Sequence, residues 1–77
     1  MQTNQANVVV DLKQVINRKH GDELESALGG IQGVSRARVS SRARRLVLVD
    51  YDPETVDSQK ILGTVVRRGF DARLIGM

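Results

Sequence analysis

The residue with the clearest chemical potential is His20, the single histidine of this 77-residue chain. An imidazole can coordinate zinc(II), nickel(II) or copper, and neighbouring carboxylates can add oxygen ligands. Asn17 lies three residues before His20, and Asp22 and Glu23 follow it closely. We therefore take His20, Asn17 and Asp22 as the candidate metal residues. One imidazole predicts only weak binding of a divalent transition metal, because high-affinity zinc sites use about four ligands, or three and a water.

The chain contains no cysteine, which removes a disulfide framework, a thiolate metal site and a cysteine nucleophile. It has no serine, histidine and aspartate in a recognisable catalytic setting. Gly29-Gly30 falls in the C-terminal half of an expected helix, which is the wrong end to hold phosphate. We therefore predict a binding protein and not an enzyme. His20 then has a second interpretation, as an exposed loop residue near Phe70 that holds no ligand.

Five arginines gather in residues 36–45, where no acid accompanies them. They are Arg36, Arg38, Arg42, Arg44 and Arg45. This segment predicts either a site for an anionic partner (nucleic acid, an acidic protein or a phosphate head group) or a charged strand edge that discourages aggregation. Nucleic acid is disfavoured, because sheet-based RNA binders stack bases on aromatic side chains. The chain has one tyrosine, one phenylalanine and no tryptophan.

The first half of the chain predicts a strand, a helix and a second strand. Residues 8–12 are β-branched and short, which favours a strand, and residues 13–21 form a polar connection. A helix follows, with the acids of residues 22–25 in its first turn, where they suit the helix dipole. Glycines end it. Residues 34–40 alternate in polarity, as in a half-exposed strand. The apolar stripe of the helix consists of Leu24, Ala27, Leu28 and Ile31.

The second half begins with a hairpin turn at residues 40–45 and a strand over residues 46–51. Asp57 is the expected N-cap of a second helix. Val56 and Ile61 flank that helix start as a hydrophobic staple.

Glycines punctuate the second helix. Gly63 lies inside it and predicts close packing there, since glycine costs about 1 kcal/mol relative to alanine in a helix interior. Gly69 ends the helix, and Phe70 packs back on it in a Schellman motif. Residues 71–77 form a last short strand.

The expected order is β-α-β-β-α-β, an α+β ferredoxin-like sandwich. Right-handed crossovers place both helices on one face of a four-stranded antiparallel sheet. We expect residues 7–77 to form a single domain after a disordered lead-in over residues 1–6. The apolar runs are far shorter than the roughly 20 residues that cross a bilayer, and the polar N-terminus lacks a signal-peptide core. A soluble, cytoplasmic domain with no membrane partner is therefore expected.

Three local patterns follow one another along the chain. They are Leu24-Glu25-x-Ala27-Leu28 with Gly33-Val34, then Val47-x-Val49-x-Tyr51-Asp52-Pro53, then Ile61 through Gly69-Phe70-Asp71-Ala72. Together they cover most of residues 8–75, and in order and spacing they resemble the heavy-metal-associated (HMA) domain family. This family includes copper chaperones and the N-terminal domains of metal-transporting P-type ATPases. The resemblance implies a ferredoxin-like sandwich that carries copper(I) or zinc(II) between two thiolates.

The family carries Met-x-Cys-x-x-Cys just before its first helix. Counting back from Leu24 places the two cysteine positions at Asn17 and His20, and the methionine at Val15. Copper(I) and zinc(II) prefer soft thiolate or borderline imidazole donors, for which a neutral asparagine is a poor substitute. The resemblance therefore implies a domain related to metal trafficking that has lost its two-thiolate site.

The uncovered face of the expected sheet is a second candidate site. If the strand over residues 46–51 turns its valines toward the helices, as the family's pattern implies, Leu46 and Leu48 lie on that uncovered face. An apolar centre with a charged rim is typical of a protein interface, and the alternative is a few ordinary exposed leucines. The remaining members of this surface are Val9, Ile75, Arg36, Arg38 and Arg73.

Three functions follow from these observations. The leading hypothesis is a divergent HMA-like domain that acts as an interaction module, toward a protein partner or a second copy of itself. The first alternative is weak, non-thiolate binding of zinc, nickel or copper through His20 and nearby carboxylates. The second is binding of an anion or nucleic acid through the hairpin Arg36–Arg45. No tightly held cofactor is expected.

Overall fold

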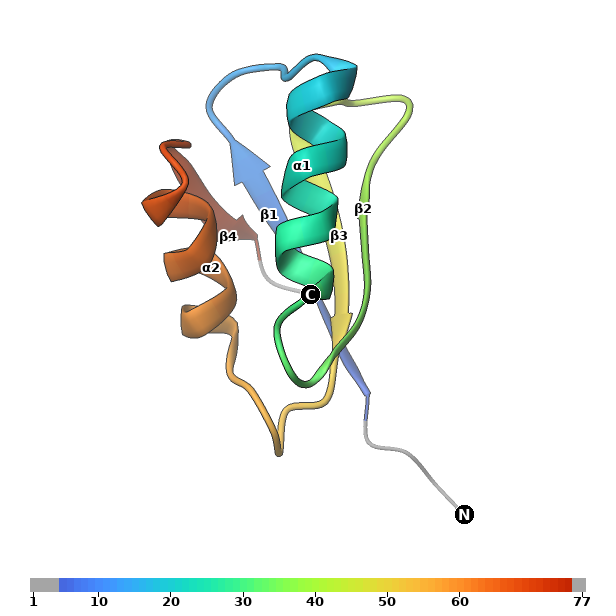
Figure 1. Cartoon of the computed structure of the whole chain (residues 1–77), viewed down its shortest axis with the longest axis vertical. Helices are drawn as coiled ribbons and strands as arrows, with labels where there is room; N and C mark the ends of the chain where they lie inside the picture. Colours follow the sequence, from blue (N-terminus) through green and yellow to red (C-terminus); the bar gives the residue numbers. More distant parts are fainter. Residues whose placement is uncertain (1–4, 76–77) are drawn as a thin grey trace.

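The computed structural model describes residues 5–75, which form a two-layer sandwich in the order β-α-β-β-α-β (Figure 1). The strands make one antiparallel sheet in the order β2-β3-β1-β4. This arrangement confirms the predicted ferredoxin-like fold. The elements are β1 (Ala6–Leu12), α1 (Arg18–Gly29), β2 (Val34–Val39), β3 (Leu46–Tyr51), α2 (Ser58–Arg67) and β4 (Ala72–Ile75).

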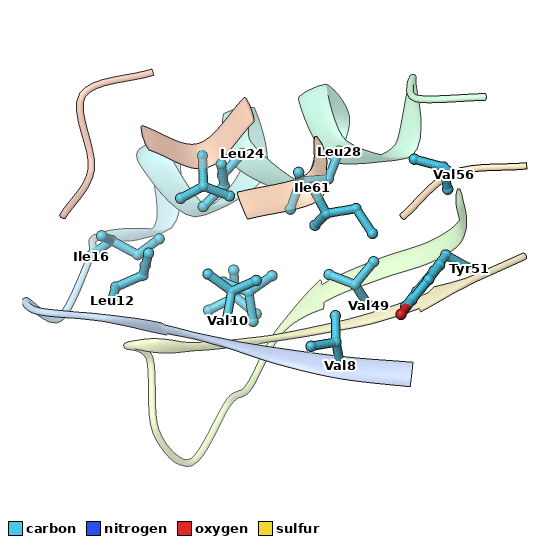
Figure 2. Close-up of a cluster of buried hydrophobic side chains, with 13 residues drawn as sticks. Val8, Val10, Leu12, Ile16, Leu24, Leu28, Val49, Tyr51, Val56 and Ile61 are labelled. Carbon is cyan, nitrogen blue, oxygen red and sulfur yellow. The ribbon is translucent and has the colours of Figure 1, made fainter. Parts of the chain in front are cut away.

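Both helices cover the same face of the sheet, and buried apolar side chains fill the space between the layers (Figure 2). Alternation along β1 directs Val8, Val10 and Leu12 into this core, where they meet Leu28 and Ile61 from the helices. Burial of apolar surface is the main term that favours folding, at about 25 cal/mol per Å². The opposite face of the sheet carries the residues that alternate with these, and neither α1 nor α2 lies over it.

The first helix begins earlier than the sequence predicted. Asn17 is its N-cap, and its Oδ1 accepts a hydrogen bond from the backbone N–H of His20 at 2.8 Å. This bond satisfies one of the backbone donors that have no partner inside the helix. Residues 18–20 therefore form the first turn, and that turn contains no acid. Asp22, which the sequence placed in the first turn, lies in the second.

The second helix follows the prediction at both ends. Asp57 is its N-cap, and its Oδ1 accepts a backbone hydrogen bond at 2.9 Å. At the other end the N–H of Gly69 donates to Val66 O at 2.9 Å, and the N–H of Phe70 donates to Val65 O at 3.4 Å. Gly69 has a φ of 96°, which completes the predicted Schellman motif.

Two positions depart from the sequence expectation. A Cβ added at Gly63 would meet no atom within 4 Å, so the predicted close packing at this glycine is wrong. β1 begins at Ala6, which pairs with Tyr51, so the strand takes in the last residue of the expected lead-in. Gln5 precedes the strand, and the other residues of that lead-in, 1–4, lie outside the described residues, as do residues 76–77.

Candidate interaction surface and the β1–α1 junction

His20 lies on the first turn of α1 and not in a loop. Its ring stands edge-on against Phe70, with the ring centroids 6.5 Å apart and the planes at 74°. Asp22 is exposed two residues further along the helix, on a different side, because residues i and i+2 do not face each other. The structure thus brings His20 to Phe70 and does not bring Asp22 to His20.

The residues at the two family cysteine positions do not fit a thiolate-type metal site. The side-chain oxygen of Asn17 accepts the helix-capping hydrogen bond, which leaves His20 as the single imidazole donor. Within residues 5–75, no three or more His, Asp or Glu side chains gather closely enough to hold a metal ion. Copper(I) and zinc(II) of the family type need two soft donors at this point.

A positive charge of the protein itself lies at this β1–α1 junction, which we define as residues 13–17. Arg44 donates from Nε to Ile16 O at 3.1 Å and from Nη2 to Asn17 O at 3.3 Å. Gly21 leaves room for the guanidinium, because a Cβ there would lie 2.7 Å from Nη2 of Arg44. Charged donors make the stronger hydrogen bonds, so Arg44 fixes the backbone just before α1. Its charge also repels a second cation at this place.

On the face of the sheet that α1 and α2 do not cover, the strand register aligns residues into rows. The central row runs from Arg38 on β2 through Leu48 on β3 and Val9 on β1 to Ile75 on β4. Leu48 and Ile75 are each 40% exposed. The sequence prediction that these apolar residues share one face with Arg38 is confirmed by this register.

A row with charged residues lies on each side of the apolar row. Each is two residues away along the strands, which is a distance of about 6–7 Å between rows. On one side Leu46 faces Asp11, and Asp11 faces Arg73. On the other side Arg36 faces Asp50, and Asp50 faces Asn7. We call this whole surface the open face. It consists of Asn7, Val9, Asp11, Arg36, Arg38, Arg45, Leu46, Leu48, Asp50, Arg73 and Ile75.

Asp11 is a member of the open face that the sequence analysis did not predict. It is 7% exposed although it lies on the uncovered side of the sheet, because two arginine side chains cover it. Arg45 Nε lies 3.3 Å from its Oδ1, and Arg73 Nε lies 3.2 Å from its Oδ2. The alternation of side chains along β1 could have predicted this position, since it places Asp11 on the same side of the sheet as Val9.

The five arginines expected to act as one patch divide among different places. Arg36 and Arg38 are exposed on β2, and Arg42 is exposed at the hairpin tip. Arg44 turns to the β1–α1 junction, and Arg45 pairs with Asp11. Among residues 5–75, intramolecular partners thus engage two of the five guanidinium groups, those of Arg44 and Arg45.

Neither a protein-family model nor a curated protein matches the chain. Solved structures do match. The N-terminal domain of a potential copper-translocating P-type ATPase from Bacillus subtilis has a TM-score of 0.82 at 24% identity, over 94% of this chain and 89% of that one. Oxidized MerP from Ralstonia metallidurans CH34 has a TM-score of 0.80 at 17% identity, over 91% and 96%. The yeast copper transporter domain Ccc2a has 0.78 at 20%, over 90% and 93%.

These similarities confirm the predicted resemblance at the level of the fold. The chain has the ferredoxin-like architecture of HMA domains, and it has no cysteine with which to form their Cys-x-x-Cys motif. In residues 5–75 no helix has the length and apolar character that crossing a membrane requires.

Proposed function

We propose that this chain is a divergent HMA-like domain, related to metal trafficking, that works in the cytoplasm as a protein-interaction module. It acts without the two-thiolate site and without catalysing a reaction. The single observation that carries the proposal is the apolar row of Leu48, Val9 and Ile75, which the sheet register places side by side on an uncovered face.

The chemistry of the open face supports an interface. Protein interfaces combine an apolar centre with a polar or charged rim, and arginine is enriched in them. Here the apolar row lies between two charged rows, and Arg38 extends it on β2. The sheet also provides a rigid backbone, so a partner meets side chains that are already in position.

The metal alternative has a direct test at His20. Zinc(II), nickel(II) and copper(I) are titrated into the wild type and His20→Ala while the backbone amides are followed by NMR. We expect no saturable shifts at micromolar metal, because His20 has no second soft donor beside it. Saturable shifts in residues 17–23 that disappear in His20→Ala would instead support metal binding through His20.

The interface itself is tested by photo-crosslinking from inside cells that express the chain. Benzoylphenylalanine is placed at Leu48 on the open face or, as the control, at Val66 on α2. Val66 is a matched position, because it is an apolar residue 49% exposed on the helical layer. We expect one discrete crosslinked protein from position 48 and none from position 66.

A second pair of variants controls for effects of the benzoylphenylalanine side chain itself. Leu48→Glu and Val66→Glu each place a carboxylate at an exposed apolar site. Leu48→Glu should abolish association with the crosslinked partner, and Val66→Glu should leave it unchanged. Equal crosslinking from both positions, or association that survives Leu48→Glu, would show that the open face is not the interface.

A further inference from the structure

The pairing of Asp11 leaves most donors of its two arginines free. A guanidinium carries five N–H donors in a planar fork, and Arg45 and Arg73 each contact Asp11 through Nε. Their Nη groups make no hydrogen bond or ion pair to any other residue in 5–75. The side chain of Arg45 is 55% exposed and that of Arg73 is 78% exposed. Two sets of paired Nη donors therefore face solvent beside the apolar row.

Asp11 sets the position of both forks. A nearly buried carboxylate is retained only when cations pair with it, so Asp11 holds the two guanidinium groups over its oxygens. Arg73 forms a hydrogen bond with Oδ2, while the contact of Arg45 with Oδ1 is ionic, since Oδ1 accepts no hydrogen bond within the described residues. Arginine recognises carboxylates through two parallel N–H···O bonds, and forks held in place lose less side-chain entropy on binding.

The charge of the open face determines which partner fits. It carries four arginines (Arg36, Arg38, Arg45 and Arg73) against two aspartates (Asp11 and Asp50), which is a positive excess on one surface. A second copy of the chain would bring the same excess against it and be repelled. Nucleic acid fits poorly, because Tyr51 is buried on the helix side and the open face offers no aromatic ring for bases.

We propose that the open face binds an acidic segment of a partner protein whose apolar residues cover Leu48, Val9 and Ile75. Its carboxylates bind to Arg45 and Arg73, and Asp11 is the positioning residue for both. This inference rests on the proposed function and names the chemistry of the partner at that same site.

The probe is a short peptide, acetyl-Glu-Glu-Leu-Val-Leu-Glu-Glu-amide, compared with a version in which glutamine replaces every glutamate. Each is titrated into the ¹⁵N-labelled full chain, and the backbone amides and arginine Nε–H signals are followed by NMR. We expect the glutamate peptide to shift the amides of Val9, Leu48 and Ile75 and the Nε–H signals of Arg45 and Arg73. The glutamine peptide should bind about tenfold more weakly or not at all.

Asp11→Asn separates positioning from net charge. The substitution keeps the side-chain size and makes the open face more positive. If charge alone attracted the peptide, this variant would bind it more tightly. With forks positioned by Asp11, we expect binding about tenfold weaker, since two arginine side chains must then be ordered on association. Asp11→Glu should recover part of the loss. The peptide-free spectrum of each variant shows that it is folded.

Paired substitutions of Arg45 and Arg73, which we call the arginine clamp, give a test that does not depend on Asp11. Arg45→Gln with Arg73→Gln should abolish discrimination between the two peptides, while Arg42→Gln, at the hairpin tip, should leave it intact. Equal binding of both peptides to the wild type would overturn the proposal that Arg45 and Arg73 bind carboxylates. It would still be consistent with an interface at the open face. No shift at millimolar glutamate peptide would also overturn that proposal, while crosslinking from position 48 still decides the proposed function.

Two further results would assign the open face to another occupant and overturn the inference. Shifts of Val9, Leu48 and Ile75 that grow with protein concentration in the absence of peptide would identify a second copy. Binding of oligothymidylate to the same residues, lost in the paired arginine variant, would identify nucleic acid.

Discussion

Adjacent arginines of the hairpin engage different parts of the molecule. Arg44 donates to the backbone carbonyls of Ile16 and Asn17, whereas Arg45 pairs with the carboxylate of Asp11. Arg42, two residues earlier, has an exposed side chain with no hydrogen bond or ion pair to residues 5–75. Within residues 42–45, one arginine thus binds the backbone before α1, another pairs with a carboxylate of the open face, and a third is exposed to solvent.

Arg44→Ala should lower the free energy of unfolding by about 1–2 kcal/mol, because two carbonyls at the β1–α1 junction lose a charged donor. Arg42→Ala is the matched control and should change stability by less than about 0.5 kcal/mol. Urea denaturation of the three proteins, with the slope m held in common, measures the difference. Equal stability of the two variants would mean that the bonds of Arg44 are replaced by water without loss.

These residue-scale contacts were beyond prediction from the sequence. Arg44 meets Ile16 at a separation of 28 residues, and Arg73 meets Asp11 at a separation of 62. A run of arginines in the sequence indicates positive charge but not which guanidinium groups will find partners after folding. The apolar members of the open face were predictable, because strand alternation by itself assigns Leu46 and Leu48 to one side.

At the scale of elements, the sequence identified all six but misplaced the start of α1. Asp57 and Gly69 carry recognised capping signals, and α2 begins and ends beside them. Asn17 carries one too, but the charges of Arg18 and Lys19 that follow it oppose the helix dipole, and no Glu or Gln completes a capping box at His20. The cap and the core packing of α1 outweigh that unfavourable charge.

Glycines in different backbone environments should respond oppositely to alanine. Gly63 lies in α2 with no atom within 4 Å of an added Cβ, so Gly63→Ala should stabilise by about 0.5–1 kcal/mol through helix propensity. Gly33 has a φ of 103°, and an added Cβ would lie 2.8 Å from Val56 Cγ1, so Gly33→Ala should destabilise by about 1–3 kcal/mol. Thermal unfolding followed by circular dichroism measures both, and a loss of stability in Gly63→Ala would contradict the first.

At the scale of the whole molecule, the sheet order predicts a gradient of local stability. β1 and β3 are the central strands, each hydrogen-bonded on both edges, whereas β2 and β4 each pair with one strand within residues 5–75. Native-state hydrogen exchange should therefore be slowest in β1 and β3, at residues such as Val10 and Val47, which are fully buried. Amides of β4 that exchange as slowly as those of β1 would mean that the outer edge of β4 is also protected in solution.

The way in which the β1–α1 junction is held also has a consequence for regulation. Asn17 and Arg44 are the groups that shape it, and neither an amide nor a guanidinium responds to oxidants or to the supply of soft metals. The domain should therefore keep one conformation across redox conditions. Under the proposed function, we expect binding of a partner to follow the amounts of the two proteins and to be the same in oxidising and reducing buffer.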